Sequence, residues 1–258
     1  MGESSVAAAR GRSSPWMGFQ ESLNRASAGL WAGYGTHRRH VMECLTAHAP
    51  DLPGRLTVLG AGNCNDLDLA TVTALFREVH LVDIDAAALD GARRRQRMNS
   101  VSSLHAHGGV DVTSLDQARP PGLGPADVVM SAAILSQLIA GAVAEGRAPD
   151  GLLRVRDTHL ETMLNLLRPG GRGLLINDLV SSDTYPQLRT TSHHELPQLL
   201  MNLIRLGNFF TGCNPWAIAQ RLAQAPLHAS RIAVSPPWRW DIGPRSYLVC
   251  AISFNHPQ

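Results

Sequence analysis

The sequence predicts an α/β fold in which a mostly parallel sheet carries helices on both of its faces. Short apolar runs typical of buried strands alternate with segments whose apolar residues recur every three or four positions, as in helices. This alternation is the pattern of parallel sheets covered on both sides. The 258 residues, 44% of them hydrophobic, suffice for one large domain with a small annex.

The individual elements follow from these runs. Strands are expected at residues 56–59, 79–83, near Leu104, at 127–131 and at 173–178, and helices at 66–76, 86–98 and 155–167. The chain closes with strands at 231–235 and 246–254, and the loop between them is expected to hold Pro236, Pro237, Trp238 and Trp240. Two successive strands without a helix between them indicate an antiparallel hairpin at the sheet edge. The prediction is therefore a seven-stranded sheet.

The predicted chain has three parts. Residues 1–15 are small, polar and Arg-rich, and are expected to be a disordered leader. Residues 16–54 carry a helical pattern interrupted around Gly33 and Gly35, which predicts an N-terminal cap of two helices. Residues 55–258 form the main domain, with a helical insert at about 181–229 that is expected to cover a substrate.

Charge and composition exclude several function classes. The formal net charge of +2 falls short of the basic field of a nucleic-acid binder, so we expect no nucleic-acid partner. All 23 basic residues other than histidine are arginine, which rules out Schiff-base catalysis and a lysine-containing phosphate loop. No run approaches the roughly 20 apolar residues of a membrane span, and the four cysteines form no CxxC pair. We therefore expect a cytoplasmic protein without a membrane partner.

A glycine-rich turn is the first candidate site. The strand that ends at Leu59 continues through Gly60, Ala61 and Gly62 toward a helix, so the backbone can approach a ligand without a Cβ in the way. Adenine cofactors bind at turns of this kind. A turn of small residues without any ligand is the alternative.

Two acids follow the next strand. Asp83 lies in the run LVDID about twenty residues after the turn, where a carboxylate can accept hydrogen bonds from ribose hydroxyls. Asp85 is expected to cap the following helix instead. Ligands of open α/β sheets bind at this edge.

Five stretches together resemble the class I S-adenosylmethionine-dependent methyltransferases of the small-molecule type: VLGAGNCND, VHLVDIDAAALDGARRR, GVDVTSL, ADVVMSAAILSQL and LLRPGGRGLLINDL. The closing strand SYLVCAISF adds to the resemblance. It implies a Rossmann-like fold, S-adenosyl-L-methionine as cofactor, and methyl transfer to oxygen, nitrogen or carbon of a small molecule. The implied cofactor contacts are Gly60, Ala61, Gly62, Asn65, Asp66, Asp83, Ile84, Asp111, Val112 and Ser131.

By the same resemblance, Asp83 holds the ribose, Asp111 reaches the adenine amino group, and Ser131 lies beside the methyl group. Two positions depart from the family's pattern: Val58 replaces the acid two positions before the first glycine, and Cys64 replaces the third glycine. Asp66 or Asp68 could supply the missing charge at the methionine end. Acids in the first turn of a helix are also ordinary partners of its dipole, so both interpretations stay open.

Methyl transfer mainly requires an aligned nucleophile and removal of a proton. Asp178, at the end of its strand, and His193, in the insert, are the candidate catalytic bases. A solvated surface position is the alternative for His193. His105 and His107 form an HxH pair, but no carboxylate stands nearby in the sequence, so no metal site is predicted.

Two other functions stay open. Gly60, Gly62 and Asn65 follow the GxGxxG spacing of a dinucleotide site except at the last position, which leaves a NAD-dependent oxidoreductase as an alternative. Val58 and Cys64 also allow a noncatalytic interaction protein with the methyltransferase fold. The sequence after Asp127 lacks an Asn-Pro-Pro-aromatic motif, which favours a small-molecule acceptor. No particular oligomeric state is predicted.

Overall fold

The computed structural model describes residues 15–258, with side chains from residue 18 onward. Residues 1–14, nearly all of the predicted leader, lie outside the described residues. The first helix, α1, begins at Pro15, the last residue of the predicted leader.

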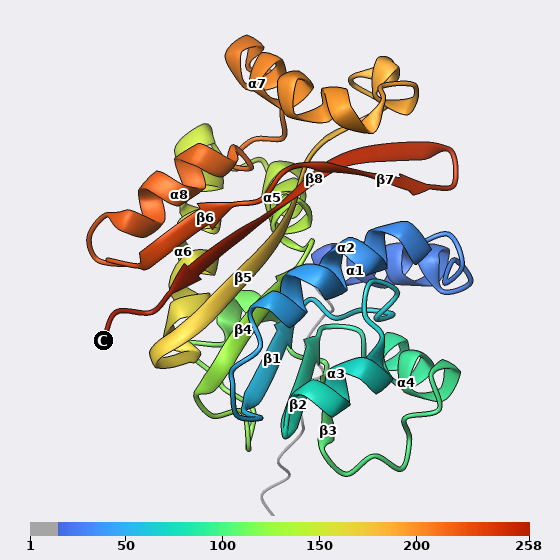
Figure 1. Cartoon of the computed structure of the whole chain (residues 1–258), viewed down its shortest axis with the longest axis vertical. Helices are drawn as coiled ribbons and strands as arrows, with labels where there is room; N and C mark the ends of the chain where they lie inside the picture. Colours follow the sequence, from blue (N-terminus) through green and yellow to red (C-terminus); the bar gives the residue numbers. More distant parts are fainter. Residues whose placement is uncertain (1–14) are drawn as a thin grey trace, which may run out of the picture.

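An eight-stranded sheet forms the centre of the molecule (Figure 1). Its strands are β1 (Arg55–Leu59), β2 (Glu78–Asp83), β3 (Leu104–Gly108), β4 (Ala126–Ala132), β5 (Leu167–Ser181), β6 (Ser230–Val234), β7 (Trp238–Ile242) and β8 (Arg245–Asn255). Their order is β3-β2-β1-β4-β5-β8-β6, and β7 pairs with β8 outside this path. The first five strands are parallel, whereas β8 runs antiparallel to β5, β6 and β7. The predicted α/β class, parallel sheet and antiparallel terminal strands are confirmed.

One predicted loop is a strand. From Trp238 onward the loop expected at Pro236 to Trp240 forms β7, which pairs antiparallel with β8 and adds an eighth strand to the seven predicted. The alternation of Trp238 and Trp240 puts both rings on one face, where they contact α2 (Gly35–Ala47). The Trp238 indole donates to Nδ1 of His37 at 3.1 Å, and Trp240 stacks on the same imidazole. Because two prolines directly precede Trp238, this segment was expected to be a loop.

Helices cover both faces of the sheet (Figure 1). The helices are α1 (Pro15–Ser27), α2, α3 (Leu69–Leu75), α4 (Ala86–Arg95), α5 (Leu135–Ala144), α6 (Pro149–Asn165), α7 (Leu196–Leu206) and α8 (Pro215–Ala223). One apolar core joins the sheet to α5, α6 and α8, and a second joins it to α2, α3 and α4. Helix α5 was not among the elements expected from the sequence. Since α8 packs in the first core, half of the predicted insert belongs to the sheet's own helical layer.

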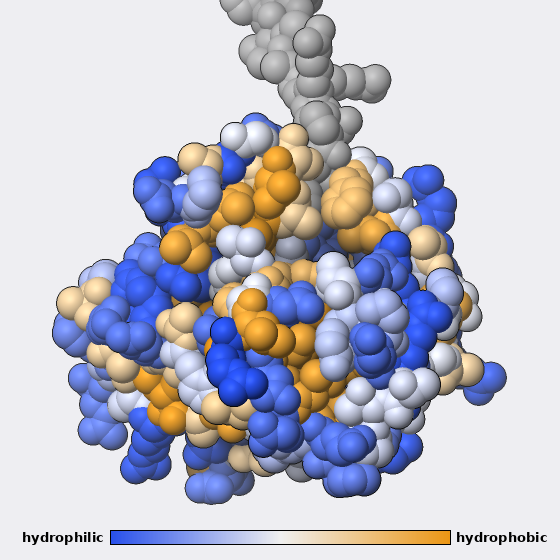
Figure 2. Space-filling model, turned by 90° about the horizontal axis from the view of Figure 1, so that it is seen from above, coloured by the Kyte–Doolittle hydropathy of each residue, from blue (hydrophilic) through white to orange (hydrophobic). Residues whose placement is uncertain are grey.

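Helix α7 has a small core of its own at the ends of β5 and β8. It buries Leu196, Leu199, Leu200 and Leu203 there, and it exposes Met201 and Leu206. Figure 2, which views the molecule from this end, shows apolar patches separated by polar side chains. Among residues 15–258, no helix combines the length and apolarity needed to cross a membrane.

Within β5, Gly173 leaves room for an aromatic ring of β8. A Cβ added at Gly173 would lie 2.2 Å from Cζ of Phe254, a fully buried residue of β8. We expect Gly173→Ala to lower the free energy of unfolding by about 1–3 kcal/mol, because the backbone or the ring must move. Urea denaturation measures this loss.

Gly91→Ala is the matched control, since nothing lies within 4 Å of a Cβ at this position in α4. There the greater helix propensity of alanine should raise the free energy of unfolding by up to about 1 kcal/mol. Equal stabilities of the two variants would contradict this description of β5 and β8.

Candidate functional site

The glycine turn after β1 adopts backbone conformations that few side chains tolerate. Gly60 and Gly62 have φ values of +69° and +46°, and Cys64, at the position of the family's third glycine, also has φ +46°. A Cβ added at Gly60 would lie 2.7 Å from Cβ of Ile134, and one at Gly62 would lie 2.7 Å from Oδ1 of Asn24. Conformation and space therefore both require glycine at position 60, whereas at position 62 the positive φ favours glycine and the nearest atom belongs to the movable Asn24 side chain.

Asp83, the last residue of β2, faces this turn. Its Oδ2 accepts a 2.7 Å hydrogen bond from the N–H of Gly62, and its Oδ1 accepts one of 2.9 Å from the N–H of Asp85. Burial raises the pKa of the Asp83 carboxyl, and these two backbone donors partly oppose the rise. Asp85 in turn caps α4 by accepting from the N–H of Ala88 at 3.0 Å, which confirms its predicted role. The turn and the end of β2 form one hydrogen-bonded unit.

Helix α1 lies across this unit. Nδ2 of Asn24 is 3.4 Å from Oδ1 of Asp83 and 3.3 Å from Oδ2 of Asp85, so one amide bridges both carboxylates. In return, Asn65 of the turn donates from Nδ2 to the carbonyl of Ser27 at 2.8 Å. The N-terminal helices therefore contact the predicted site directly.

The two acids after the turn have different surroundings. Oδ1 of Asp68 accepts from the N–H groups of Ala70 and Thr71 at 3.1 and 3.3 Å, which is an ordinary helix cap. Asp66 is buried instead, and burial raises its pKa to about 6, partly offset by its own backbone N–H and by Arg38. Of the two, Asp66 is the buried carboxyl available beside the turn.

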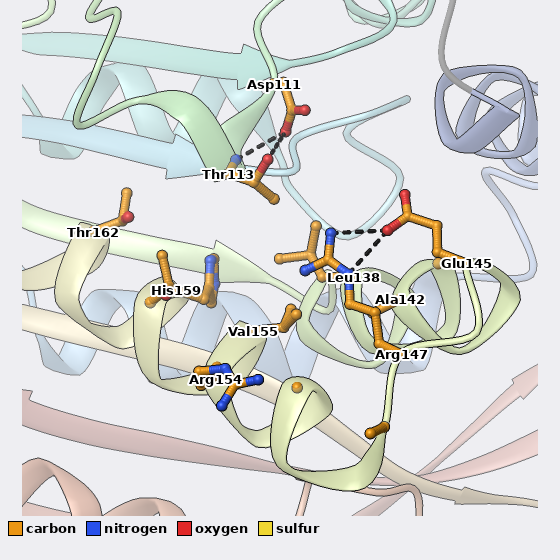
Figure 3. Close-up of a pocket in the computed structure, with 14 residues that line it drawn as sticks. Asp111, Thr113, Leu138, Ala142, Glu145, Arg147, Arg154, Val155, His159 and Thr162 are labelled. Carbon is orange, nitrogen blue, oxygen red and sulfur yellow. Dashed lines mark hydrogen bonds and ion pairs between the residues drawn. The ribbon is translucent and has the colours of Figure 1, made fainter.

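A cavity of about 530 Å³ lies next to the predicted adenine contact (Figure 3). Its walls come from α5, α6 and the short helix η1 (Val112–Ser114), which Asp111 caps. Asp111 accepts from the backbone N–H of Thr113 at 2.9 Å and from its hydroxyl at 2.7 Å. The ion pair between Glu145 and Arg147 also lines the cavity. Its volume is typical of small-ligand sites.

Asp178 lies near the end of β5, where pairing with β8 shifts in register. The Ser136 hydroxyl, in the first turn of α5, is 2.8 Å from both carboxylate oxygens of Asp178. Burial raises the pKa of Asp178 to about 6, and the Ser136 hydrogen bond counteracts this rise. A carboxyl with a pKa near neutrality can exchange a proton under physiological conditions.

His193, the other predicted base, has different surroundings from Asp178. It is exposed, in the short helix η3 (His193–Glu195) before α7. Its charge is close enough to α2 to help lower the pKa of His40, an effect that is due mainly to burial of His40. The structure thus gives His193 the surface position that was its alternative interpretation.

Solved structures with a similar arrangement identify the fold. A 1,6-didemethyltoxoflavin N1-methyltransferase from Burkholderia thailandensis, bound to S-adenosylhomocysteine, matches with a TM-score of 0.56 and 14% identity over 94% of this chain and 87% of that one. The N-methyltransferase NodS from Bradyrhizobium japonicum WM9, in complex with S-adenosylhomocysteine, matches with a TM-score of 0.50 and 12% identity over 86% and 87% of the two chains. The chain has a class I methyltransferase fold. No family model matches the sequence, and no curated protein does.

Within the methyltransferase fold, the structure groups most of the predicted cofactor residues. Gly60, Ala61, Gly62, Asn65 and Asp66 form the turn, Asp83 ends β2 and Ile84 follows it, and Asp111 and Val112 follow β3. Ser131 is different, because it is fully buried and its hydroxyl is 2.8 Å from Nε2 of His159 in α6. That hydroxyl joins α6 to the sheet, and the residue after β4 that packs against Gly60 is Ile134.

Four residues of the site were missed by the sequence analysis. Asn24 and Ser27 contact the turn from α1, Arg38 donates to the carbonyl of Asn65 at 2.6 Å from α2, and Ser136 binds Asp178. The first three lie about 25 to 60 positions from their partners in the sequence, so no local spacing reveals them. Ser136 lies in ADVVMSAAILSQL, one of the stretches that resemble the methyltransferases, but no role was predicted for it.

Proposed function

We propose that this protein transfers a methyl group from S-adenosyl-L-methionine to an oxygen, nitrogen or carbon atom of a small molecule. The observation that carries the proposal is the junction of Asp83 with the glycine turn, where a buried carboxylate and two left-handed glycines meet at the carboxyl ends of parallel strands. Open α/β sheets bind their ligands at this edge.

The chain's own groups fit the cofactor. The Asp83 carboxylate suits ribose hydroxyls, and the cavity beside Asp111 supports an adenine contact there. Oδ1 of Asn65 is buried without a hydrogen-bond partner among the described residues, so it can accept from the ammonium group of a ligand. When bound, the cofactor supplies a methyl group on a positively charged sulfur.

Access to Asp83 requires movement of one side chain. The Asn24 amide now covers both carboxylates, but its contacts of 3.3 and 3.4 Å are long for hydrogen bonds to charged oxygen and therefore weak. Rotation of Asn24 gives ribose hydroxyls access to Oδ1 of Asp83. Helix α1 then remains as a cover over the bound nucleoside.

Asp66 is proposed to hold the methionine end in place of the acid missing at Val58. We expect Asp66→Asn to weaken S-adenosylmethionine binding by about 10- to 100-fold, because a charged hydrogen bond is worth about 1.5–3 kcal/mol. Asp68→Asn is the matched control: it removes a carboxylate two positions away that caps α3. The control should keep its affinity, and calorimetry that finds equal losses in both variants would refute this role for Asp66.

Proton removal is assigned to Asp178. Its carboxyl lies between β5 and the start of α5, and its pKa of about 6 leaves it mostly ionised at pH 7.5. The hydroxyl of Ser136 orients the carboxylate without taking its charge. His193 is proposed only as an acceptor contact near α7, since it is exposed whereas Asp178 is buried.

The acceptor is proposed to be small, and the reaction to take place in the cytoplasm. The two similar structures named above are methyltransferases, and one was solved with 1,6-didemethyltoxoflavin bound. Exposed apolar residues on α7 beside the sheet end suit an apolar acceptor. Four free cysteines, three of them buried, fit a reducing compartment.

A thermal-shift series separates the proposal from its alternatives. A ligand that binds only folded protein raises the unfolding midpoint, so S-adenosylmethionine and S-adenosylhomocysteine should raise it and NAD should not. A rise with NAD alone would support the oxidoreductase. No response to any of the three, from protein that unfolds cooperatively, would support the noncatalytic fold.

A further inference from the structure

A second constellation of polar side chains lies at the opposite end of β2 from Asp83. Glu78 and His80 project from the same face of β2, and parallel pairing places His105 of β3 directly beside His80. One ligand atom from each of these three residues lies within 4.8 Å of the others. Glu78 and Asp83 are separated by five strand positions, or about 16 Å at 3.3 Å per residue. This group is therefore remote from the proposed methyl-transfer site.

We propose that Glu78, His80 and His105 bind a divalent transition-metal ion such as Zn²⁺. Oε1 of Glu78 lies 4.0 Å from Nε2 of His80 and 3.9 Å from Nε2 of His105. Ligands of a tetrahedral zinc ion at 2.0–2.1 Å are about 3.4 Å apart, so a small rotation of the exposed side chains closes the site. Two imidazoles and one carboxylate are a common ligand set for such ions.

The orientation of His80 supports a ligand on its Nε2. The His80 side chain is only 3% exposed, yet its Nε2 is buried without a hydrogen-bond partner among the described residues. Its other nitrogen, Nδ1, lies 2.9 Å from Nε2 of His107. If Nδ1 carries the proton and donates it to His107, the lone pair of Nε2 points toward Glu78 and His105. Such second hydrogen bonds fix the tautomer of metal-binding histidines.

The carboxylate of Glu78 is also held in place. Arg55 contacts only Oε2, from Nε at 2.8 Å and from Nη2 at 2.7 Å, which leaves Oε1 facing the two histidines. The positive charge of Arg55 offsets that of the carboxylate, so binding must rely on the imidazole nitrogens. We therefore expect selectivity for zinc or cobalt over magnesium, which prefers oxygen ligands.

The site is accessible and lies on the edge of the sheet. The side chains of His105 and Glu78 are 42% and 31% exposed, so an ion can enter from solvent. Strand β3 is the terminal strand of the sheet. An ion bound there would cross-link β3 to β2 and stabilise the sheet edge without taking part in methyl transfer.

No metal site was predicted from the sequence, because no carboxylate stands near His105 and His107 along the chain. Glu78 and His80 have the same spacing of two positions, so both motifs place their side chains on one face of a strand. Only the parallel register of β2 and β3 brings the two motifs together.

Cobalt titration of the full chain without a histidine tag tests the site. We expect one equivalent of Co²⁺ to bind wild type with a visible absorption band, to be displaced by Zn²⁺, and to withstand a hundredfold excess of Mg²⁺. His105→Ala and Glu78→Gln should each weaken binding at least tenfold. His105 is largely exposed, so its variant should fold, which circular dichroism can verify. Zn²⁺ should raise the melting midpoint of wild type more than that of His105→Ala.

His194→Ala is the matched control, because it removes another exposed histidine, which lies in η3 before α7 and not on β2 or β3. It should bind Co²⁺ like wild type. Absence of Co²⁺ binding by wild type, unchanged affinity of His105→Ala, or an equal loss in His194→Ala would each overturn the proposed site.

Discussion

Replacing Asp178 by asparagine should stabilise the protein at pH 7.5 while lowering its methyl-transfer rate about 10²- to 10⁴-fold, the usual contribution of a general base. Asparagine has nearly the shape of the protonated acid, and its oxygen can still accept from Ser136. The rate loss is measured by single-turnover methyl transfer once an acceptor is known. The stability gain needs only denaturant titration of the two proteins.

The expected gain follows from the raised pKa of Asp178, about 6 in the folded protein against about 3.9 in an unfolded chain. In the folded protein Asp178 keeps its proton to a higher pH than in the unfolded chain. The free energy that folding loses by burying the charged carboxylate is therefore absent below about pH 4, grows as the pH rises to about 6, and stays constant above that pH. Two pH units correspond to about 3 kcal/mol, so Asp178→Asn should gain about 1–3 kcal/mol at pH 7.5 and almost nothing at pH 4.

Asp183→Asn is the control for Asp178, since Asp183 follows the same strand but is exposed and paired with Arg245. It should change stability by less than about 0.5 kcal/mol and leave the rate unchanged. If Asp178→Asn kept the full methyl-transfer rate, Asp178 could not be the catalytic base. A loss of stability at pH 7.5 would contradict the unfavourable burial of its charge.

Replacing Asp83 by asparagine should weaken S-adenosylhomocysteine binding about 10- to 100-fold. The carboxylate can accept from two ribose hydroxyls while it holds the N–H groups of Gly62 and Asp85, whereas an amide offers one oxygen for all four donors. Loss of charged hydrogen bonds costs about 1.5–3 kcal/mol, and each 1.4 kcal/mol is tenfold in affinity. Isothermal titration calorimetry measures the difference.

Asp90→Asn provides the comparison, because Asp90 is exposed on α4, a few residues from Asp83. Asp90→Asn should bind S-adenosylhomocysteine with the same affinity as wild type. If Asp83→Asn binds as tightly as Asp90→Asn, the ribose is held elsewhere and the assignment of Asp83 is wrong.

The sequence predicted the central sheet because its strands are strongly apolar and separated by helical patterns. It predicted the cap at Asp85 because capping depends on local residues. The strand at Trp238 was missed because two prolines precede it, and its stability comes from pairing with β8 and packing on His37. Elements stabilised by distant partners leave little local signal.

The site residues that could be predicted from the sequence are those whose role depends on a special backbone conformation or on a position at the end of a strand. Gly60 and Gly62 need left-handed conformations, and Asp83 occupies a strand end. The contacts of Asn24 with Asp83 and of Ser136 with Asp178 depend on how α1 and α5 pack, which no spacing in the sequence encodes. The family resemblance placed Ser131 beside the methyl group, but its side chain faces α6.

Titration of wild type with S-adenosylhomocysteine in a calorimeter tests cofactor binding most directly. We expect one bound equivalent, with an affinity in the range of about 1 μM to 1 mM in which enzymes commonly bind their substrates, and a weaker affinity in Asp83→Asn. Absence of binding heat at millimolar ligand over a range of temperatures, from protein that unfolds cooperatively, would contradict it.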